Sequence, residues 1–229
     1  MCAIKLVIFD FDGTLVYSLD AFAETINLVL KNLGFPSFPR KKIMEIAKLP
    51  FDKYISIIIP SDTLNRTSIV AKFEKEFKRI YRKNHLKLIK PVTNVLLTLK
   101  RLCEMNLSIG IVTARKLTID YVKEELAFLS LNSFIRMLVT FNDIPFQEPT
   151  KVNLISECIR RLNVKSRECM VVGDSPEDIL AGRKIGTLTI GTLYGFYGEK
   201  IIDCHPHFTI RKPLEILKIL DTFIDPIFV

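Results

Sequence analysis

The chain has 229 residues, of which 48% are hydrophobic and 25% are charged. This composition supports a sizeable buried core and excludes an intrinsically disordered polymer, and the length fits one large domain or one domain carrying a smaller insertion. Lys and Arg outnumber Asp and Glu by 33 to 25, so the formal net charge is +8. That charge is compatible with a nucleic acid, a membrane surface or a small anionic ligand as partner.

Membrane and disulfide classes are disfavoured by the same sequence. No apolar run reaches the roughly 18 residues that a bilayer requires, and the apolar stretch near the N-terminus is too short for a signal peptide. The five cysteines are scattered and contain no CxxC pair, which is typical of reduced packing thiols. We therefore expect a cytoplasmic protein without a membrane partner.

The first predicted strand, at 4–9, is followed by a region that has a helical pattern only. Helices are expected at 18–33, 40–48, 51–59 and 66–84. They are separated by chain-breaking sequences such as GFPSFP at 34–39. This pattern predicts a small helical domain over residues 17–90, inserted after the first strand of a core formed by residues 1–16 and 91–229.

Strands and helices alternate in the rest of the chain. Helices are expected at 94–105 and 152–162, where apolar residues recur on one face. Short apolar runs typical of buried parallel strands occur at 4–9, 107–112, 136–141, 169–172, 187–190 and 207–210. The alternation predicts an α/β fold, with a doubly wound, Rossmann-like parallel sheet that helices cover on both faces.

Polar side chains follow three of these strands, at the point where each strand ends. In an open parallel sheet the carboxyl ends of the strands form one edge, and ligands bind beyond it. The residues expected there are Asp10, Asp12, Gly13, Thr113, Ala114, Arg115, Asp174 and Asp178, and Lys151 begins the helix before the third of these strands.

The acidic members of this group indicate a metal site. Asp10 and Asp12 would repel each other at a sheet edge unless a cation compensated them, and Asp174 adds a third carboxylate. Clustered carboxylate oxygens suit Mg²⁺. Asp178 has a second explanation, because Ser175-Pro176-Glu177-Asp178 is also a helix-capping sequence.

The other members indicate a phosphate ligand. The backbone N–H groups of Gly13 and Ala114, the Thr113 hydroxyl and the Lys151 ammonium can all donate to phosphate oxygens. Thr113 could instead cap the next helix, and Lys151 taken alone would be an ordinary surface lysine. A carboxylate that faces a Mg²⁺-neutralised phosphoryl group can attack phosphorus and form an aspartyl-phosphate.

These motifs resemble those of the haloacid dehalogenase superfamily of phosphohydrolases. DFDGTL at 10–15 matches the DxDxT signature of that family, VTA at 112–114 fits its second motif, and GDSPEDI at 173–179 fits its fourth. The resemblance covers nearly the whole chain. The helical insertion lies where one branch, which includes phosphoglycolate phosphatases and beta-phosphoglucomutases, carries a helical cap domain.

The resemblance implies a role for each matched residue. Asp10 would be the nucleophile, and Asp12 would protonate the leaving alcohol and then activate water. Thr113 and Lys151 would hold the phosphoryl oxygens. The implied Mg²⁺ ligands are Asp10, the backbone carbonyl of Asp12, Asp174, and Asp178 either directly or through water.

The third motif departs from the family pattern. Relatives in this branch carry Lys-Pro-x-Pro before the helix, whereas this chain has Gln147-Glu148-Pro149-Thr150-Lys151, with Glu148 near the usual lysine position. Other branches place their lysine at the start of the helix, so Lys151 is expected to reach the site. Arg115 stands where a small polar residue is common, and it would either add a cation near the phosphate or point outward.

The sequence thus predicts a Mg²⁺-dependent phosphatase that hydrolyses a small phosphomonoester, similar to phosphoglycolate or a sugar phosphate, through an aspartyl-phosphate. A phosphomutase of the beta-phosphoglucomutase type is an alternative, because Asp10 and Asp12 serve both chemistries. A basic nucleic-acid-binding protein is disfavoured because no binding motif accompanies the charge, and a catalytically idle phosphate sensor is disfavoured by the intact acids. A monomer or a homodimer is expected.

Overall fold

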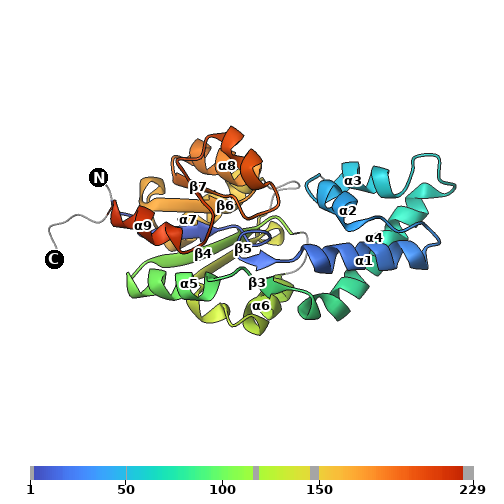
Figure 1. The fold of residues 1–229 in the computed structure, drawn as a ribbon, viewed down its shortest axis with the longest axis horizontal. Helices are drawn as coiled ribbons and strands as arrows, with labels where there is room; N and C mark the ends of the chain where they lie inside the picture. The colour runs from blue at the N-terminus through green and yellow to red at the C-terminus, as the bar shows by residue number, and fades with distance from the viewer. Residues whose placement is uncertain (1–2, 50, 116–118, 145–149, 224–229) are drawn as a thin grey trace. The chain divides into compact units, whose positions relative to one another are not determined.

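The computed structural model describes residues 3–49, 51–115, 119–144 and 150–223, and Figure 1 shows the course of the chain. The chain divides into two compact units. One comprises Met1–Tyr17 and Lys90–Val229, and the other comprises Ser18–Ile89. No helix in the part of the chain that the structure describes has the length and apolar character needed to cross a membrane.

The first unit is built on a six-stranded parallel sheet with the strand order β5-β4-β1-β6-β7-β8. Its strands are β1 (Leu6–Phe9), β4 (Ser108–Thr113), β5 (Met137–Thr140), β6 (Cys169–Gly173), β7 (Leu188–Thr192) and β8 (Phe208–Ile210). Strand β1 is buried along its whole length, as expected for a strand covered on both faces. The predicted α/β fold with a doubly wound parallel sheet is confirmed.

Helices cover both faces of this sheet. On one face, α7 (Lys151–Leu162) and α8 (Pro176–Ile185) share a buried cluster with the sheet, which includes Leu6, Ile8, Val112, Val171, Leu154 and Ile155. Figure 1 shows α5 (Val95–Glu104) on the opposite side of the sheet from α8, and α5 contacts α9 (Glu215–Asp221). The helix α6 (Ile119–Phe128) lies between β4 and β5 in the chain.

Strand register brings the carboxyl ends of three strands to the same level. Phe9, at the end of β1, pairs with Ile111 of β4 on one side and with Val172 of β6 on the other. The strand order reverses at β1, since β4 and β5 lie on one side of it and β6, β7 and β8 on the other. Ligands of open α/β sheets bind at such a reversal, so the fold itself points to this edge.

A short antiparallel pair was not expected from the sequence. The strands β2 (Val16–Tyr17) and β3 (Lys90–Pro91) pair Val16 with Pro91 and Tyr17 with Lys90. Two residues are too few to show a period, so hydrophobic patterning cannot reveal such strands. The pair lies immediately before and after Ser18–Ile89 in the chain.

Among its described residues, the second unit contains helices only. They are α1 (Leu19–Asn32), α2 (Arg40–Ile46), α3 (Phe51–Ile58), α4 (Arg66–Asn84) and the short 3₁₀ turn His85–Lys87. This unit has its own buried cluster, to which α1 contributes Ile26 and Leu30 and α4 contributes Phe73. The helices expected between residues 18 and 84 are therefore present.

Candidate active site

Asp10 follows β1 directly and continues its hydrogen bonding, because its N–H donates to the Val172 carbonyl at 2.9 Å. The chain then turns sharply at Gly13, whose φ of 78° lies in the left-handed region that favours glycine. The N–H of Gly13 donates to the Val16 carbonyl at 2.9 Å and closes this turn. A Cβ on Gly13 would lie 2.5 Å from Asp174 Oδ2, so the close approach of Asp174 also requires glycine here.

Asp174 follows β6, and both of its carboxylate oxygens receive hydrogen bonds. The Thr14 hydroxyl donates to Oδ1 at 3.4 Å, and the Phe196 N–H, from the loop after β7, donates to Oδ2 at 2.5 Å. This loop approaches closely because Gly195 has no side chain: a Cβ there would lie 2.1 Å from Asp174 Cβ. Two loops therefore fix the orientation of a carboxylate that is only 2% exposed.

Asp178 both caps a helix and faces the site, so the two explanations of this residue are compatible. Its Oδ2 accepts the N–H and the hydroxyl of Ser175 at 3.2 and 2.7 Å, which forms the capping box at the start of α8. Its Oδ1 forms an ion pair with Lys151 at 2.8 Å. The cap thus fixes a carboxylate whose other oxygen remains directed at the lysine.

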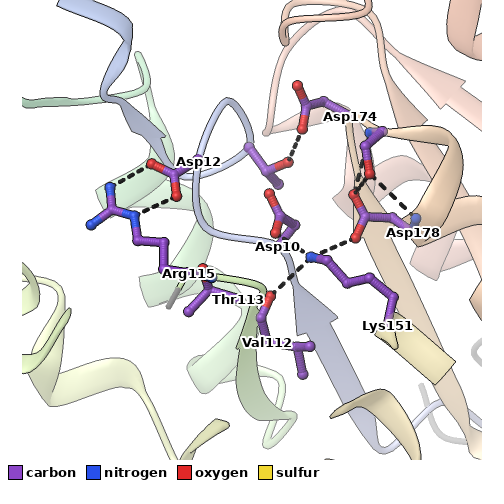
Figure 2. Close-up of polar contacts among 10 residues, drawn as sticks. Asp10, Asp12, Val112, Thr113, Arg115, Lys151, Asp174 and Asp178 are labelled. Carbon is purple, nitrogen blue, oxygen red and sulfur yellow. Dashed lines mark hydrogen bonds and ion pairs between the residues drawn. The ribbon is translucent and has the colours of Figure 1, made fainter. Parts of the chain in front are cut away.

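Lys151 is the first residue of α7 and points into the site, as Figure 2 shows. A capping box between Thr150 and Asn153 fixes this end of the helix. The ammonium of Lys151 contacts Asp10, Asp178 and, at 3.3 Å, the Val112 carbonyl. Its side chain is only 9% exposed, so it is not an ordinary surface lysine. Glu148 and the rest of 145–149 lie outside the described residues.

The buried carboxylates carry more negative charge than Lys151 balances. Burial raises the pKa of Asp10 to about 7, the charges of Asp178 and Asp12 add to this effect, and the Lys151 ammonium opposes it. Burial also raises the pKa of Asp174, with contributions from the charges of Asp10 and Asp178. Burial disfavours the charged form of Lys151, but the carboxylates of Asp10 and Asp178 outweigh it and raise the lysine pKa.

These three carboxylates fit a divalent cation. Oxygen atoms of Asp10, Asp174 and Asp178 lie within 4.8 Å of one another, and they are the candidate metal ligands among the described residues. Three carboxylates against one ammonium leave two negative charges, which a divalent cation would compensate. Hard oxygen donors of this kind suit Mg²⁺ or Ca²⁺ better than a thiophilic metal.

The carboxylate of Asp12 lies apart from this group and pairs with Arg115. Figure 2 shows it turned toward the Arg115 guanidinium and away from the contacts of Lys151. Arg115 Nε and Nη2 donate to the two Asp12 oxygens at 2.6 and 2.5 Å. Arg115 Nη1 also contacts both oxygens of Glu125, in α6, at 2.7 Å. The Arg115 side chain is only 12% exposed, so of the two expected orientations the outward one is wrong. That Arg115 adds a cation near the phosphate stays a prediction.

Thr113 ends β4 with its side chain 1% exposed, and Ala114 follows it at the surface. The Thr113 hydroxyl accepts the N–H of Arg115 at 3.3 Å, a local turn contact. In the described residues α6 begins at Ile119, six positions later. Since Phe9 pairs with Ile111, Thr113 ends the strand next to the one that Asp10 follows.

Sequence reasoning missed three contributors to this site. Glu125 lies in the middle of a helix and has no motif around it, so only the fold reveals its contact with Arg115. Phe196 contributes a backbone N–H, which no side-chain pattern can signal. Gly195 lies three residues after the end of β7 and did carry a signal, because a glycine in a loop can permit a close backbone approach.

Comparison with known proteins places these motifs in a family context. Residues 7–192 match the family model described as haloacid dehalogenase-like hydrolase. The pyrophosphatase PpaX of Anoxybacillus flavithermus is 27% identical over 95% of this chain and 97% of its own length. The phosphoglycolate phosphatase of Aquifex aeolicus is 25% identical over 96% of this chain and 98% of its own length.

A solved structure shares the fold. A haloacid dehalogenase-like family hydrolase from Streptococcus pneumoniae superimposes with a TM-score of 0.80 at 20% identity, over 94% of this chain and 98% of that one. Because the superposition covers 94% of this chain, the similarity in fold includes both the sheet and the helical insertion.

The raised pKa of Asp10 predicts a specific pH dependence of stability in metal-free protein. Below about pH 4 the Asp10 carboxyl is protonated in both the folded and the unfolded chain. Between pH 4 and 7 the unfolded chain loses this proton, whereas burial disfavours its loss in the folded chain. Its contribution to stability is therefore full at low pH and is lost as pH rises toward 7. We expect Asp10→Asn, which stays neutral, to exceed wild type in unfolding free energy by roughly 2–4 kcal/mol at pH 7.

Urea denaturation between pH 4 and 8 in EDTA measures this difference. The exposed residue Asp62 supplies the control, because Asp62→Asn makes the same chemical change outside the buried cluster. A difference between Asp10→Asn and wild type that does not grow between pH 4 and 7 would contradict the assignment of uncompensated negative charge to this site.

Proposed function

Because the chain belongs to the haloacid dehalogenase-like hydrolase family, we propose that it is a Mg²⁺-dependent phosphatase that hydrolyses a small phosphomonoester through an aspartyl-phosphate on Asp10. Membership of this family, together with its phosphatase-named relatives, makes the protein an enzyme of the phosphatase type. The observation that carries the proposal is the ammonium of Lys151 held between Asp10 and Asp178 at the carboxyl edge of the sheet.

In the first step an oxygen of the Asp10 carboxylate attacks phosphorus. The bond between phosphorus and the leaving-group oxygen breaks, and Asp12 gives its proton to that oxygen. In the second step a water molecule attacks phosphorus, its proton passes to Asp12, and the bond to Asp10 breaks. Phosphate leaves, and both carboxyl groups return to their initial states.

The phosphoryl oxygens would be held by donors at the ends of β4 and α7. Thr113 supplies a hydroxyl, Ala114 a backbone N–H, and Lys151 an ammonium that is already positioned beside Asp10. Gly13 was also expected to donate, but its N–H is bound to the Val16 carbonyl. We therefore assign the phosphate contacts to Thr113, Ala114 and Lys151. The role of Gly13 is to form the turn that positions Asp12.

Asp10, Asp174 and Asp178 would hold Mg²⁺, together with the backbone carbonyl of Asp12. When bound, the ion supplies charge compensation between the Asp10 carboxylate and the phosphoryl group, which otherwise repel each other. The hydrogen bonds from Thr14 and Phe196 keep the Asp174 carboxylate oriented for this purpose.

Removal of the proposed nucleophile is the direct test of the reaction. Asp10→Asn keeps the size of the side chain but cannot form the acyl-phosphate, so kcat/KM for an aryl phosphate should fall by at least about 10³-fold. Phosphate release at pH 7 with saturating Mg²⁺ measures it, and Asp62→Asn serves as control. Full activity of Asp10→Asn would refute the mechanism.

Metal dependence follows from the charge of the three carboxylates. EDTA should abolish phosphate release, and Mg²⁺ should restore it. Asp174→Asn removes one negative charge while it keeps an oxygen, so the Mg²⁺ concentration for half-maximal activity should rise by about tenfold or more. A titration of activity against Mg²⁺ shows this, and an unchanged midpoint would remove Asp174 from the ligand set.

The substrate class rests on the relatives, which are named as pyrophosphatases and phosphoglycolate phosphatases. We propose a small organic phosphomonoester, with kcat/KM about tenfold or more above that for pyrophosphate. A panel of phosphoglycolate, sugar phosphates, nucleotides and pyrophosphate tests this choice. Preference for pyrophosphate would overturn it, and isomerised hexose phosphate without free phosphate would identify a mutase.

A further inference from the structure

The Arg115 guanidinium contacts three groups: the Asp12 carboxylate, the Glu125 carboxylate and the Phe11 ring. Its guanidinium forms two hydrogen bonds with Asp12, at 2.6 and 2.5 Å, and two with Glu125, both at 2.7 Å. The Arg115 Cζ also lies 5.0 Å from the centroid of the Phe11 ring, which is fully buried. A planar guanidinium with several fixed donors can hold two carboxylates at once, which a lysine ammonium cannot do in the same geometry.

The two ion pairs of Arg115 differ in burial. The Glu125 side chain is fully buried, and the Arg115 side chain is 12% exposed, whereas the Asp12 side chain is 25% exposed. A buried carboxylate retains its partner, because separation would leave an uncompensated charge in the interior. Glu125 therefore fixes Arg115 to α6, and Arg115 in turn fixes the more exposed carboxylate of Asp12.

This arrangement separates Asp12 from the lysine cluster. Lys151 contacts Asp10 and Asp178, and the group of potential metal ligands contains Asp10, Asp174 and Asp178 but not the Asp12 side chain. In Figure 2 the Asp12 carboxylate faces Arg115, on the other side of Asp10 from Lys151. Lys151 is the cation of that cluster and already pairs with two carboxylates, so Arg115 provides the Asp12 carboxylate with a separate cation.

We propose that Arg115, fixed by Glu125, is a positioning residue that keeps the Asp12 carboxylate out of the Asp10–Lys151–Asp178 cluster, and that one Asp12 oxygen exchanges its hydrogen bond from Arg115 for a proton when Asp12 acts as acid or base. The inference rests on the proposed function, because it presupposes that Asp12 transfers the proton. Arg115 thereby acts on the steps that need Asp12, namely departure of a poor leaving group and attack of water, and not on attack by Asp10.

The test compares two substrates. An aryl phosphate releases a phenolate that needs no proton, whereas an alkyl phosphate releases an alkoxide that does. The measured quantity is the ratio of kcat/KM for the aryl substrate to kcat/KM for the alkyl substrate. Loss of the acid, in Asp12→Asn, should raise this ratio by about 10²-fold or more.

Two variants remove the two-pronged contact between Arg115 and Asp12 without leaving the Glu125 carboxylate buried and without a cation. The double variant Arg115→Met/Glu125→Met replaces both charges by apolar side chains, and Arg115→Lys keeps a positive charge against Glu125 but loses the two-pronged contact. The ratio should rise at least about tenfold in the double variant and by a smaller factor in Arg115→Lys. The control Arg101→Met/Glu104→Met removes an exposed Arg–Glu pair from α5 and should leave the ratio unchanged.

A second readout separates positioning from a merely structural role. If water attack also depends on Arg115, the double variant should release about one phenolate per enzyme in a rapid burst before slow turnover. One result would overturn this inference and leave the proposed function intact. In that result Asp12→Asn raises the aryl-to-alkyl ratio of kcat/KM, whereas Arg115→Met/Glu125→Met and Arg115→Lys keep the wild-type ratio and show no burst. An unchanged ratio in Asp12→Asn would overturn the acid role itself and the inference with it.

Discussion

The close approach of three buried carboxylates is the constraint on which the active edge of this protein depends. Asp10, Asp174 and Asp178 come from two strands and one helix start, and they converge because β1 and β6 pair in register. Like charges at this spacing destabilise the fold unless they are compensated. The surrounding elements supply part of that compensation: the capped start of α7 delivers Lys151, and loops on both sides donate hydrogen bonds to Asp174.

Four of the five acidic groups at the site are paired with two cations. Lys151 serves Asp10 and Asp178, and Arg115 serves Asp12 and Glu125. This division matters because the two aspartates of the first motif have different proposed tasks although they are only two residues apart. If one cation bound both Asp10 and Asp12, a movement of one carboxylate would shift the other. Lys151 on α7 and Arg115 after β4 instead hold the two carboxylates separately.

The fold and the acidic residues could be predicted from sequence because the relevant signals are local. Asp10 and Asp174 directly follow buried apolar runs, so the parallel-sheet rule alone places them at one edge. Lys151 could be predicted only as a candidate, since its reach depends on where α7 packs. The contact between Arg115 and Glu125 could not be predicted, because a single acid within α6 has no pattern that distinguishes a buried partner from a solvated one. The strands β2 and β3 were missed because two residues carry no period.

That short strand pair has a consequence for the way the helical unit is attached. Val16 pairs with Pro91 and Tyr17 with Lys90, so the chain leaves the sheet-containing unit and returns to it at adjacent positions, about one strand spacing of 5 Å apart. The two chain connections to the unit Ser18–Ile89 thus leave from one two-stranded stem. Any folded segment whose ends lie that close together could be grafted there without stretching β1 or moving Asp10, which makes the stem a natural point for exchange of modules.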